Sequence, residues 1–174
     1  MHITFAPNGI LQIDDARILN GSFRNFSGEA SKYNREGDRN FAVLIDDVEI
    51  ADALAREGWN VKRKPPREEG DTPLMYLPVK IKFNGRGPIV YLKSGARDAI
   101  RLCNFDNCGD TVDETRACED EINCFDYIDI ISVDMDLRPY DWEVNGKEGR
   151  TAYLQSIHVT QDVDRFAERY ESLR

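Results

Sequence analysis

Residues 140–160 constrain the fold more than any other part of the chain. Two runs of alternating apolar and polar residues, 140–144 and 150–160, flank the pair Asn145-Gly146. A two-residue hairpin turn needs positive φ at both central positions, and Asn-Gly is the dipeptide that tolerates this best. The segment therefore predicts an antiparallel β-hairpin. Tyr140 and Trp142 share a face with Val144 in this alternation, so at least one of the two rings is expected in the core.

Alternation with the same period recurs in short segments separated by Gly, Pro and Asn. Further strands are expected at residues 10–19, 40–45, 59–64, 74–83, 89–93 and 127–137. A helix is expected after Asp46 or Asp47, because the apolar residues between 48 and 55 share one face and Gly58 can end the helix. A second amphipathic helix is expected at residues 162–173.

Residues 74–93 predict a second hairpin. Val79 and Ile81 alternate with Lys80 and Lys82, and the Gly- and Pro-containing stretch 84–88 is a strong turn signal. The chain is therefore expected to reverse at this turn, and the two strands to present a basic outer face.

These elements indicate a mainly β fold, an OB-fold-like Greek-key β-barrel with one internal helix and a C-terminal helix. A β-sandwich is also consistent with the pattern, because periodicity cannot separate the two. No interdomain linker is visible, so residues 1–174 are expected to form a single OB-like domain. Within it, the acidic residues 94–126 are expected to form an insertion that contains all four cysteines.

The charge of the chain is distributed unevenly. A formal net charge of −9 argues at first against a nucleic-acid partner, because phosphates are bound by Lys and Arg. Residues 103–136, however, hold 11 acidic side chains and the single base Arg116, so this segment alone carries −10 and the rest of the chain +1. Because local fields decide what a surface attracts, the composition permits a basic binding face elsewhere.

The sequence gives little support to a membrane or enzymatic role. No apolar run approaches the roughly 18 to 20 residues that span a bilayer, and the N-terminus lacks a signal-peptide pattern, so a cytoplasmic protein is expected. Catalytic motifs such as G-x-S-x-G, Walker A and H-E-x-x-H are missing, which predicts a protein that is not an enzyme. Asp134 and Asp136 leave a metal-dependent nuclease as a lesser alternative.

The four cysteines have the spacing C-x4-C-x9-C-x5-C. Four thiolates could hold one structural zinc ion and so order an irregular segment. The spacing lacks the usual C-x2-C pair, and free thiols are the default in a reducing cytosol. The zinc ligands would be Cys103, Cys108, Cys118 and Cys124.

Basic and aromatic side chains are interleaved on several of the expected strands and loops. A single strand of nucleic acid is bound by a positive groove that follows the phosphates and by aromatic faces on which bases stack. Trp59 follows the helix-ending Gly58 and is expected in the core instead. The candidate nucleic-acid-binding residues are Lys32, Tyr33, Arg35, Arg39, Lys62, Tyr76, Lys80, Lys82, Arg86, Tyr91, Arg138, Tyr140, Trp142, Lys147 and Tyr153.

Four segments resemble bacteriophage and prophage single-stranded DNA-binding proteins of the OB-fold type: residues 23–47, 53–62, 76–84 and 136–159. The most specific part is the R-P-Y-x-W-x-x-N-G-K-x-G pattern that begins at Arg138. Such proteins coat DNA exposed during phage replication or recombination, and the resemblance implies the same role here. It points to Arg138, Tyr140, Trp142, Lys147 and Tyr153 in the last hairpin and to Lys32, Tyr33, Arg35 and Arg39 in the early loop.

Two features depart from this group. The cysteine-bearing acidic segment is not typical of it, so a zinc site would be particular to this chain. Cellular single-strand binders commonly end in a disordered acidic tail that recruits partners, whereas this chain ends in RFAERYESLR.

The leading hypothesis is a sequence-tolerant single-stranded DNA-binding protein that neutralises phosphates and stacks bases during phage DNA replication or recombination. Its expected partners are single-stranded DNA, replication or recombination proteins and a second copy of the chain, and its expected location is the cytoplasm of the bacterial host. The main alternative is a phage structural or host-interaction protein with a β-sandwich surface.

Overall fold

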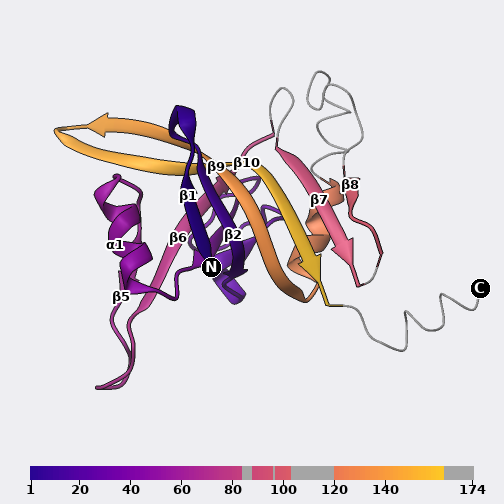
Figure 1. Ribbon diagram of the computed structural model, residues 1–174, viewed down its shortest axis with the longest axis horizontal. Helices are drawn as coiled ribbons and strands as arrows, with labels where there is room; N and C mark the ends of the chain where they lie inside the picture. Colours follow the sequence, from indigo (N-terminus) through magenta and orange to yellow (C-terminus); the bar gives the residue numbers. More distant parts are fainter. Residues whose placement is uncertain (84–87, 96, 103–119, 163–174) are drawn as a thin grey trace, which may run out of the picture.

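A computed structural model describes residues 1–83, 88–95, 97–102 and 120–162 (Figure 1). Strands dominate this part of the chain. In order, the elements are β1 His2–Phe5, the 3-10 helix η1 Pro7–Gly9, β2 Leu11–Ile18, η2 Gly21–Phe23, β3 Arg24–Asn25, β4 Arg39–Leu44, α1 Val48–Arg56, β5 Lys62–Lys64, β6 Leu74–Ile81, β7 Ile89–Ser94, β8 Ile100–Leu102, η3 Asn123–Asp126, β9 Ile130–Val144 and β10 Lys147–Gln161.

All described strands belong to one ten-stranded sheet and not to the two sheets of a sandwich. Its main path runs β5-β6-β4-β2-β9-β10-β7-β8. A further pairing joins β10 to β6 in parallel, with Ala152 opposite Val79 and Tyr153 opposite Lys80. The hydrogen-bonded neighbours β6, β4, β2, β9 and β10 therefore form a closed cycle of pairings.

The predicted hairpin at residues 140–160 is confirmed. β9 and β10, each 15 residues long, pair antiparallel on either side of Asn145-Gly146, with Val144 opposite Lys147. Asn145 and Gly146 have φ values of 52° and 79°, as a two-residue turn of this hand requires. The expected strands at 127–137 and 140–144 are thus one continuous strand.

The predicted hairpin between β6 and β7 is wrong. The two strands do not pair with each other; each pairs in parallel with β10, β6 around Tyr153 and β7 from Ser156 to Gln161. They therefore run in the same direction, one after the other along a long partner. Turn residues show that a strand is interrupted, but they do not specify which way the chain continues after the interruption.

Helix α1 is confirmed where its capping residues predict it. The side chain of Asp47 accepts a hydrogen bond from the backbone N–H of Glu49 at 2.8 Å, and Ala51 and Leu54 are buried against the sheet. The chain leaves the helix through Gly58, whose φ is 90°. The described helices include no segment with the length and hydrophobicity that a bilayer span requires.

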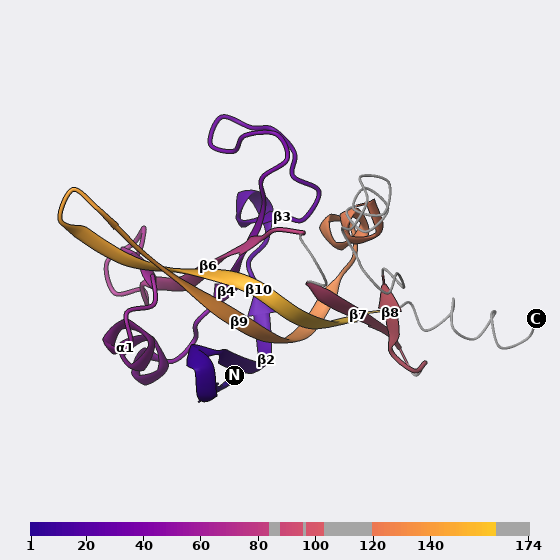
Figure 2. The same ribbon diagram turned by 90° about the horizontal axis from the view of Figure 1, so that it is seen from above.

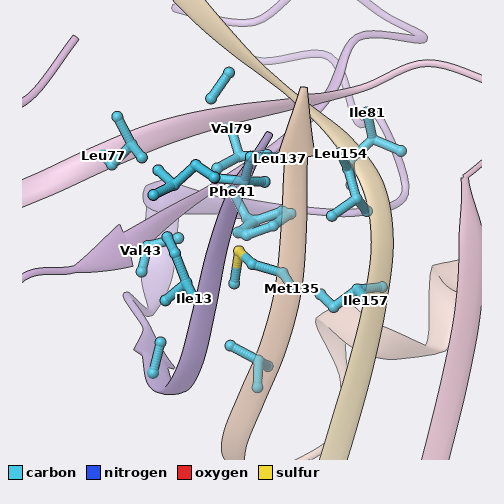
Figure 3. Packing of buried hydrophobic residues seen from close by; sticks show 14 of the residues in the cluster. Ile13, Phe41, Val43, Leu77, Val79, Ile81, Met135, Leu137, Leu154 and Ile157 are labelled. Atoms are coloured by element: carbon cyan, nitrogen blue, oxygen red, sulfur yellow. The ribbon is translucent and has the colours of Figure 1, made fainter. Parts of the chain in front are cut away.

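The hydrophobic core lies inside the cycle of strands (Figure 3). Alternate residues of each strand point into it, so the labelled side chains of Figure 3 converge from β2, β4, β6, β9 and β10. Trp59 is buried, as predicted. The cluster includes Ile13, Phe41, Val43, Leu77, Val79, Ile81, Met135, Leu137, Leu154 and Ile157.

Some expectations differ from the structure or lie outside it. The short strands β1, β3 and β8 were not predicted, since two to four residues give no clear period. The alternation in residues 127–137 predicts Ile131 on the same core face as Val133, but Ile131 is exposed. The expected C-terminal helix falls almost entirely on residues 163–174, and most of the expected insertion on residues 103–119, both outside the described residues.

We expect Leu137→Ala to lower the free energy of unfolding by about 2–5 kcal/mol, because it removes a fully buried side chain and leaves a cavity in the packed core. Val48→Ala is the control: Val48 is 52% exposed, so a change of only about 0.5 kcal/mol or less is expected. Urea denaturation followed by circular dichroism measures both. Equal effects of the two substitutions would contradict the assignment of the core.

Candidate nucleic-acid interface

A row of polar and aromatic side chains crosses four strands on the solvent face of the sheet. Asn40 on β4 is opposite Lys80 on β6, Lys80 is opposite Tyr153 on β10, and Tyr153 is opposite Arg138 on β9. Residues that are directly opposite in a sheet point to the same face. The closing pair β6–β10 therefore brings Lys80 beside two side chains that lie more than fifty positions further along the sequence.

Strand β6 supplies one side of this surface. Its alternate residues Val79 and Ile81 are buried, while Lys80 and Lys82 are exposed, as the sequence pattern predicts. Tyr76 lies on the same outer face, with Lys62 of β5 opposite it. The ring of Phe23 packs edge-on against Tyr76, with centroids 5.0 Å apart.

The β9–β10 hairpin extends from the body of the molecule as an arm, residues 138–153 (Figure 1). Tyr140 is 58% exposed and Trp142 39%, and Val144 is exposed as well, so the expectation that at least one ring lies in the core is wrong. The cause is the face on which they lie: both share the outer face of the sheet with Arg138, opposite the face that buries Leu137. β2 pairs with β9 only as far as Leu11 opposite Leu137, so along the arm β9 pairs with β10 alone among the described strands.

The outer face of the arm continues the row. The guanidinium carbon of Arg138 is 5.7 Å from the centre of the Tyr153 ring, and Tyr140 contacts the same ring edge-on with centroids 5.9 Å apart. Trp142 lies over Gly149, where a Cβ atom would be 2.3 Å from the indole. Because Lys147 is opposite Val144, all five hairpin residues predicted for the interface share one face: Arg138, Tyr140, Trp142, Lys147 and Tyr153.

Arg150 fixes the arm to the body from the opposite face. Its guanidinium binds the carboxylate of Asp141 at 2.7 Å, donates to the backbone carbonyl of Glu57 at 2.8 Å, and lies 5.5 Å from the centre of the buried Trp59 ring. The hydrogen bond from Arg150 lowers the pKa of Asp141. One arginine thus links the base of the arm to the end of α1.

A loop of residues 26–38 forms a wall beside the sheet face, on the side opposite α1 (Figure 2). The amide nitrogen of Asn34 donates to the carbonyls of Glu29, Arg35 and Asp38 at 2.9–3.1 Å, and Asn40 donates to the Asn34 side chain at 2.9 Å. These bonds hold the loop in one conformation. The groove between loop and sheet is lined by residues that include Phe23, Asn34, Arg35, Tyr76, Lys80 and Tyr153.

The loop carries three of the predicted residues in solvent. Tyr33 is 88% exposed, the ammonium of Lys32 lies 5.6 Å from the centre of its ring, and Arg35 forms an exposed ion pair with Asp38 at 3.6 Å. Exposed ion pairs contribute little to stability, so the Arg35 guanidinium can exchange this partner for a phosphate.

Arg39 and Tyr91 lie away from the row. The guanidinium of Arg39 donates to the side-chain oxygen of Asn123 at 2.7 Å and to the carbonyl of Phe26. These bonds tie the loop to η3. Arg39 also lines the groove between loop and sheet, so its role in binding nucleic acid stays a prediction. Tyr91 on β7 stacks on His158 with centroids 6.4 Å apart, further along β10.

Several predicted site residues are outside the described part of the chain: Arg86, Cys103, Cys108 and Cys118. The fourth cysteine, Cys124, is exposed; partial burial of its thiol raises the pKa, and its Sγ contacts the carbonyl of Glu121 at 3.3 Å. The zinc site therefore stays a prediction. Asp134, a residue of the nuclease alternative, accepts a hydrogen bond from the backbone N–H of Asp15 at 2.8 Å.

Phe23 is a groove residue that the sequence analysis did not select. It belongs to a polar, glycine-containing stretch in which no periodicity marks it, and only its position directly before Arg24 and the 26–38 loop could have suggested it.

Comparisons with known proteins found a matching family model and similar solved structures. A family model described as "Putative phage ssDNA-binding domain" matches residues 3–174. No curated protein matches the sequence. Three solved structures of the single-stranded DNA-binding protein from bacteriophage Enc34 are similar. The first has 10% identity and a TM-score of 0.49, covering 94% of this chain and 87% of that one.

The second, a complex with single-stranded DNA, has 11% identity and a TM-score of 0.49, covering 94% of this chain and 93% of that one. The third, a C-terminal truncation, has 11% identity and a TM-score of 0.48, covering 92% of this chain and 90% of that one.

We expect Arg150→Gln to raise the pKa of Asp141 toward the ordinary aspartate value of about 3.9, because its hydrogen-bonded partner is lost. Because the pKa of Asp141 is lower in the folded protein than in the unfolded chain, its ionised carboxylate stabilises the fold at pH values above the ordinary aspartate pKa. This stabilisation is lost as the pH falls through the pKa of the folded protein. NMR titration of the Asp141 carboxyl measures the shift. In the control Arg63→Gln, which breaks a separate pair with Asp52, the Asp141 curve should not move; an unchanged curve in Arg150→Gln would contradict the link.

Proposed function

Since the chain belongs to the phage single-stranded DNA-binding domain family over residues 3–174, we propose that it binds single-stranded DNA along the outer face of β6, β10 and the hairpin arm. The observation that carries this proposal is the row Lys80, Tyr153, Arg138, in which basic and aromatic residues lie opposite one another on neighbouring strands. Phosphates would follow the cations, and bases would stack on the rings.

The chemistry of this row supports sequence-tolerant binding. Every base has a π-face, so stacking on Tyr140, Trp142 or Tyr153 does not require a particular base. Lys80 and Lys82 attract phosphates through charge, which carries no sequence information. The 26–38 loop adds Arg35 and limits the groove from the other side.

The strand pairing supports an OB-like barrel as the scaffold. The five strands of the closed cycle come in the order β2, β4, β6, β9, β10 along the chain. Around the cycle their order is β2, β4, β6, β10, β9, so the last two strands are exchanged. The parallel pair β6–β10 closes it. We propose that these strands form one Greek-key barrel in a single domain, with the arm as an extension of its last hairpin.

The biological role that fits these properties is protection of exposed single strands during phage DNA replication or recombination inside the host cell. Such a role requires binding without cleavage, and the proposed surface uses only charge and stacking for it. The DNA should therefore remain intact when Mg²⁺ or Mn²⁺ is added to the complex.

The double substitution Lys80→Ala/Lys82→Ala should weaken binding and make it less dependent on salt. Each lost phosphate contact on a single strand lowers the slope of log K against log [salt] by about 0.7, so a decrease of about 1.4 is expected. Fluorescence anisotropy with a labelled oligothymidylate at several salt concentrations measures this slope.

Arg56→Ala is the matched control for charge, because Arg56 is an exposed base at the end of α1, on the other side of the sheet (Figure 2). Its salt slope should equal that of the wild type. An unchanged slope in the double lysine variant would contradict the proposed path of the phosphates.

Tyr140→Ala should reduce affinity by about 5- to 150-fold, the range that corresponds to loss of one stacked base. Val144→Ala is the control, since Val144 is equally exposed on the same face of the arm and has no ring. Titration of the labelled oligonucleotide compares the two variants. If both bind like the wild type, the arm is not part of the interface.

A further inference from the structure

A second cleft adjoins the groove beside β6. It is lined by Tyr33 from the 26–38 loop and by Tyr127, which directly follows η3. Phe23, Asn34 and Asn40 line both this cleft and the groove, so the two hollows meet along a shared boundary. A DNA strand that leaves the groove at this boundary would enter the cleft.

The two tyrosines at the cleft are unusually open to solvent. Tyr33 is 88% and Tyr127 77% exposed, more than any other large hydrophobic side chain among the described residues. This exposure leaves the Tyr127 ring, and the face of the Tyr33 ring away from the Lys32 ammonium, available for a ligand. Neither the acidic composition around Tyr127 nor its position in the sequence suggested a binding role, and only the cleft places it beside Tyr33.

The segment that carries Tyr127 is fixed to the base of the loop that carries Tyr33. The carboxylate of Asp126 accepts hydrogen bonds from the backbone N–H groups of Phe26 at 2.7 Å and Ser27 at 3.0 Å, and from the Ser27 hydroxyl at 2.5 Å. The rings of Phe26 and Phe125 pack edge-on with centroids 5.3 Å apart. The loop and η3 lie on the same side of the sheet (Figure 2). The cleft is therefore formed before a ligand arrives, which reduces the entropic cost of binding.

One basic and two acidic side chains line the cleft: Arg24, Glu29 and Asp126. These charges favour a neutral ring inside the cleft, and Lys32 beside Tyr33 offers a cation to a phosphate outside it. Arg24 interacts electrostatically with Asp126 and donates to the carbonyl of Ile128 at 2.6 Å, so the acidic group at the base of the cleft has a basic neighbour. Lys32, beside the Tyr33 ring, is exposed and can reach a phosphate. An unpaired base with its phosphate has this combination of a flat neutral ring and an adjacent negative charge.

We propose that the cleft binds one unpaired base between Tyr33 and Tyr127, at the end of the DNA path, with Lys32 at the adjacent phosphate. The proposal rests on the proposed function and extends the path past the groove. A base inside a duplex has both faces covered by its neighbours, so it cannot lie between two protein rings. The cleft therefore selects single strands.

The test uses the full chain with Tyr33→Ala, Tyr127→Ala and the double variant, titrated with oligothymidylates of increasing length. For long oligonucleotides each single substitution should reduce affinity by about 5- to 150-fold. The double variant should lose little more affinity than the single variant that binds less tightly, because both rings hold the same base. The length at which affinity stops increasing should be shorter in Tyr127→Ala than in the wild type, whereas Tyr127→Phe should retain both affinity and length dependence.

Phe5→Ala, a substitution of an exposed ring on β1, is the control and should bind like the wild type. If Tyr127→Ala matches this control at every length, or if the losses of the two tyrosine variants simply add, the shared base site is wrong while the proposed function stands. Failure of the wild-type protein to bind any oligonucleotide would instead overturn the proposed function and the cleft with it.

Discussion

The pairing of β10 with both β9 and β6 is the interaction on which the rest of the structure depends. One face of β10 buries Ala152 and Leu154 in the core, and the other places Tyr153 between Arg138 and Lys80. The same backbone hydrogen bonds therefore hold the core together and align the interface. Because successive side chains of a strand point to opposite faces, a shift of one residue in this register would expose the core positions and bury the interface positions together.

The difference in length between neighbouring strands gives the surface its second part. β9 continues past its last β2 partner, so the arm is a two-stranded ribbon with aromatic side chains in water. A two-stranded ribbon is marginal by itself, and Arg150 supports this one by connecting Asp141, Glu57 and Trp59. Exposing these aromatic rings to water is unfavourable for the free protein, and DNA bases that cover the rings would remove this unfavourable exposure.

Local patterns predicted the elements better than their arrangement. Asn145-Gly146 forms the turn of the last hairpin and Asp47 caps the start of α1, and both effects involve only residues close in sequence. The sequence therefore predicts both elements. The sequence after β6 did not mark a reversal of the chain, because β6 and β7 both pair in parallel with β10. Arg39 illustrates the same limit: its charge suggested a binding role, but only the fold shows that Asn123, 84 positions away in sequence, accepts its hydrogen bond.

The sequence alone determined the alternation of the strands, the positions of the tight turns and helix caps, and which segments carry basic and aromatic residues, since each depends on neighbours a few positions away. Tertiary structure decided which of these residues meet. Lys80 reaches Tyr153 only because β6 and β10 pair in parallel, and Tyr127 joins Tyr33 only because Asp126 binds the backbone of Phe26. Contacts between residues so distant in sequence depend on the packing of the whole chain, which no local pattern encodes.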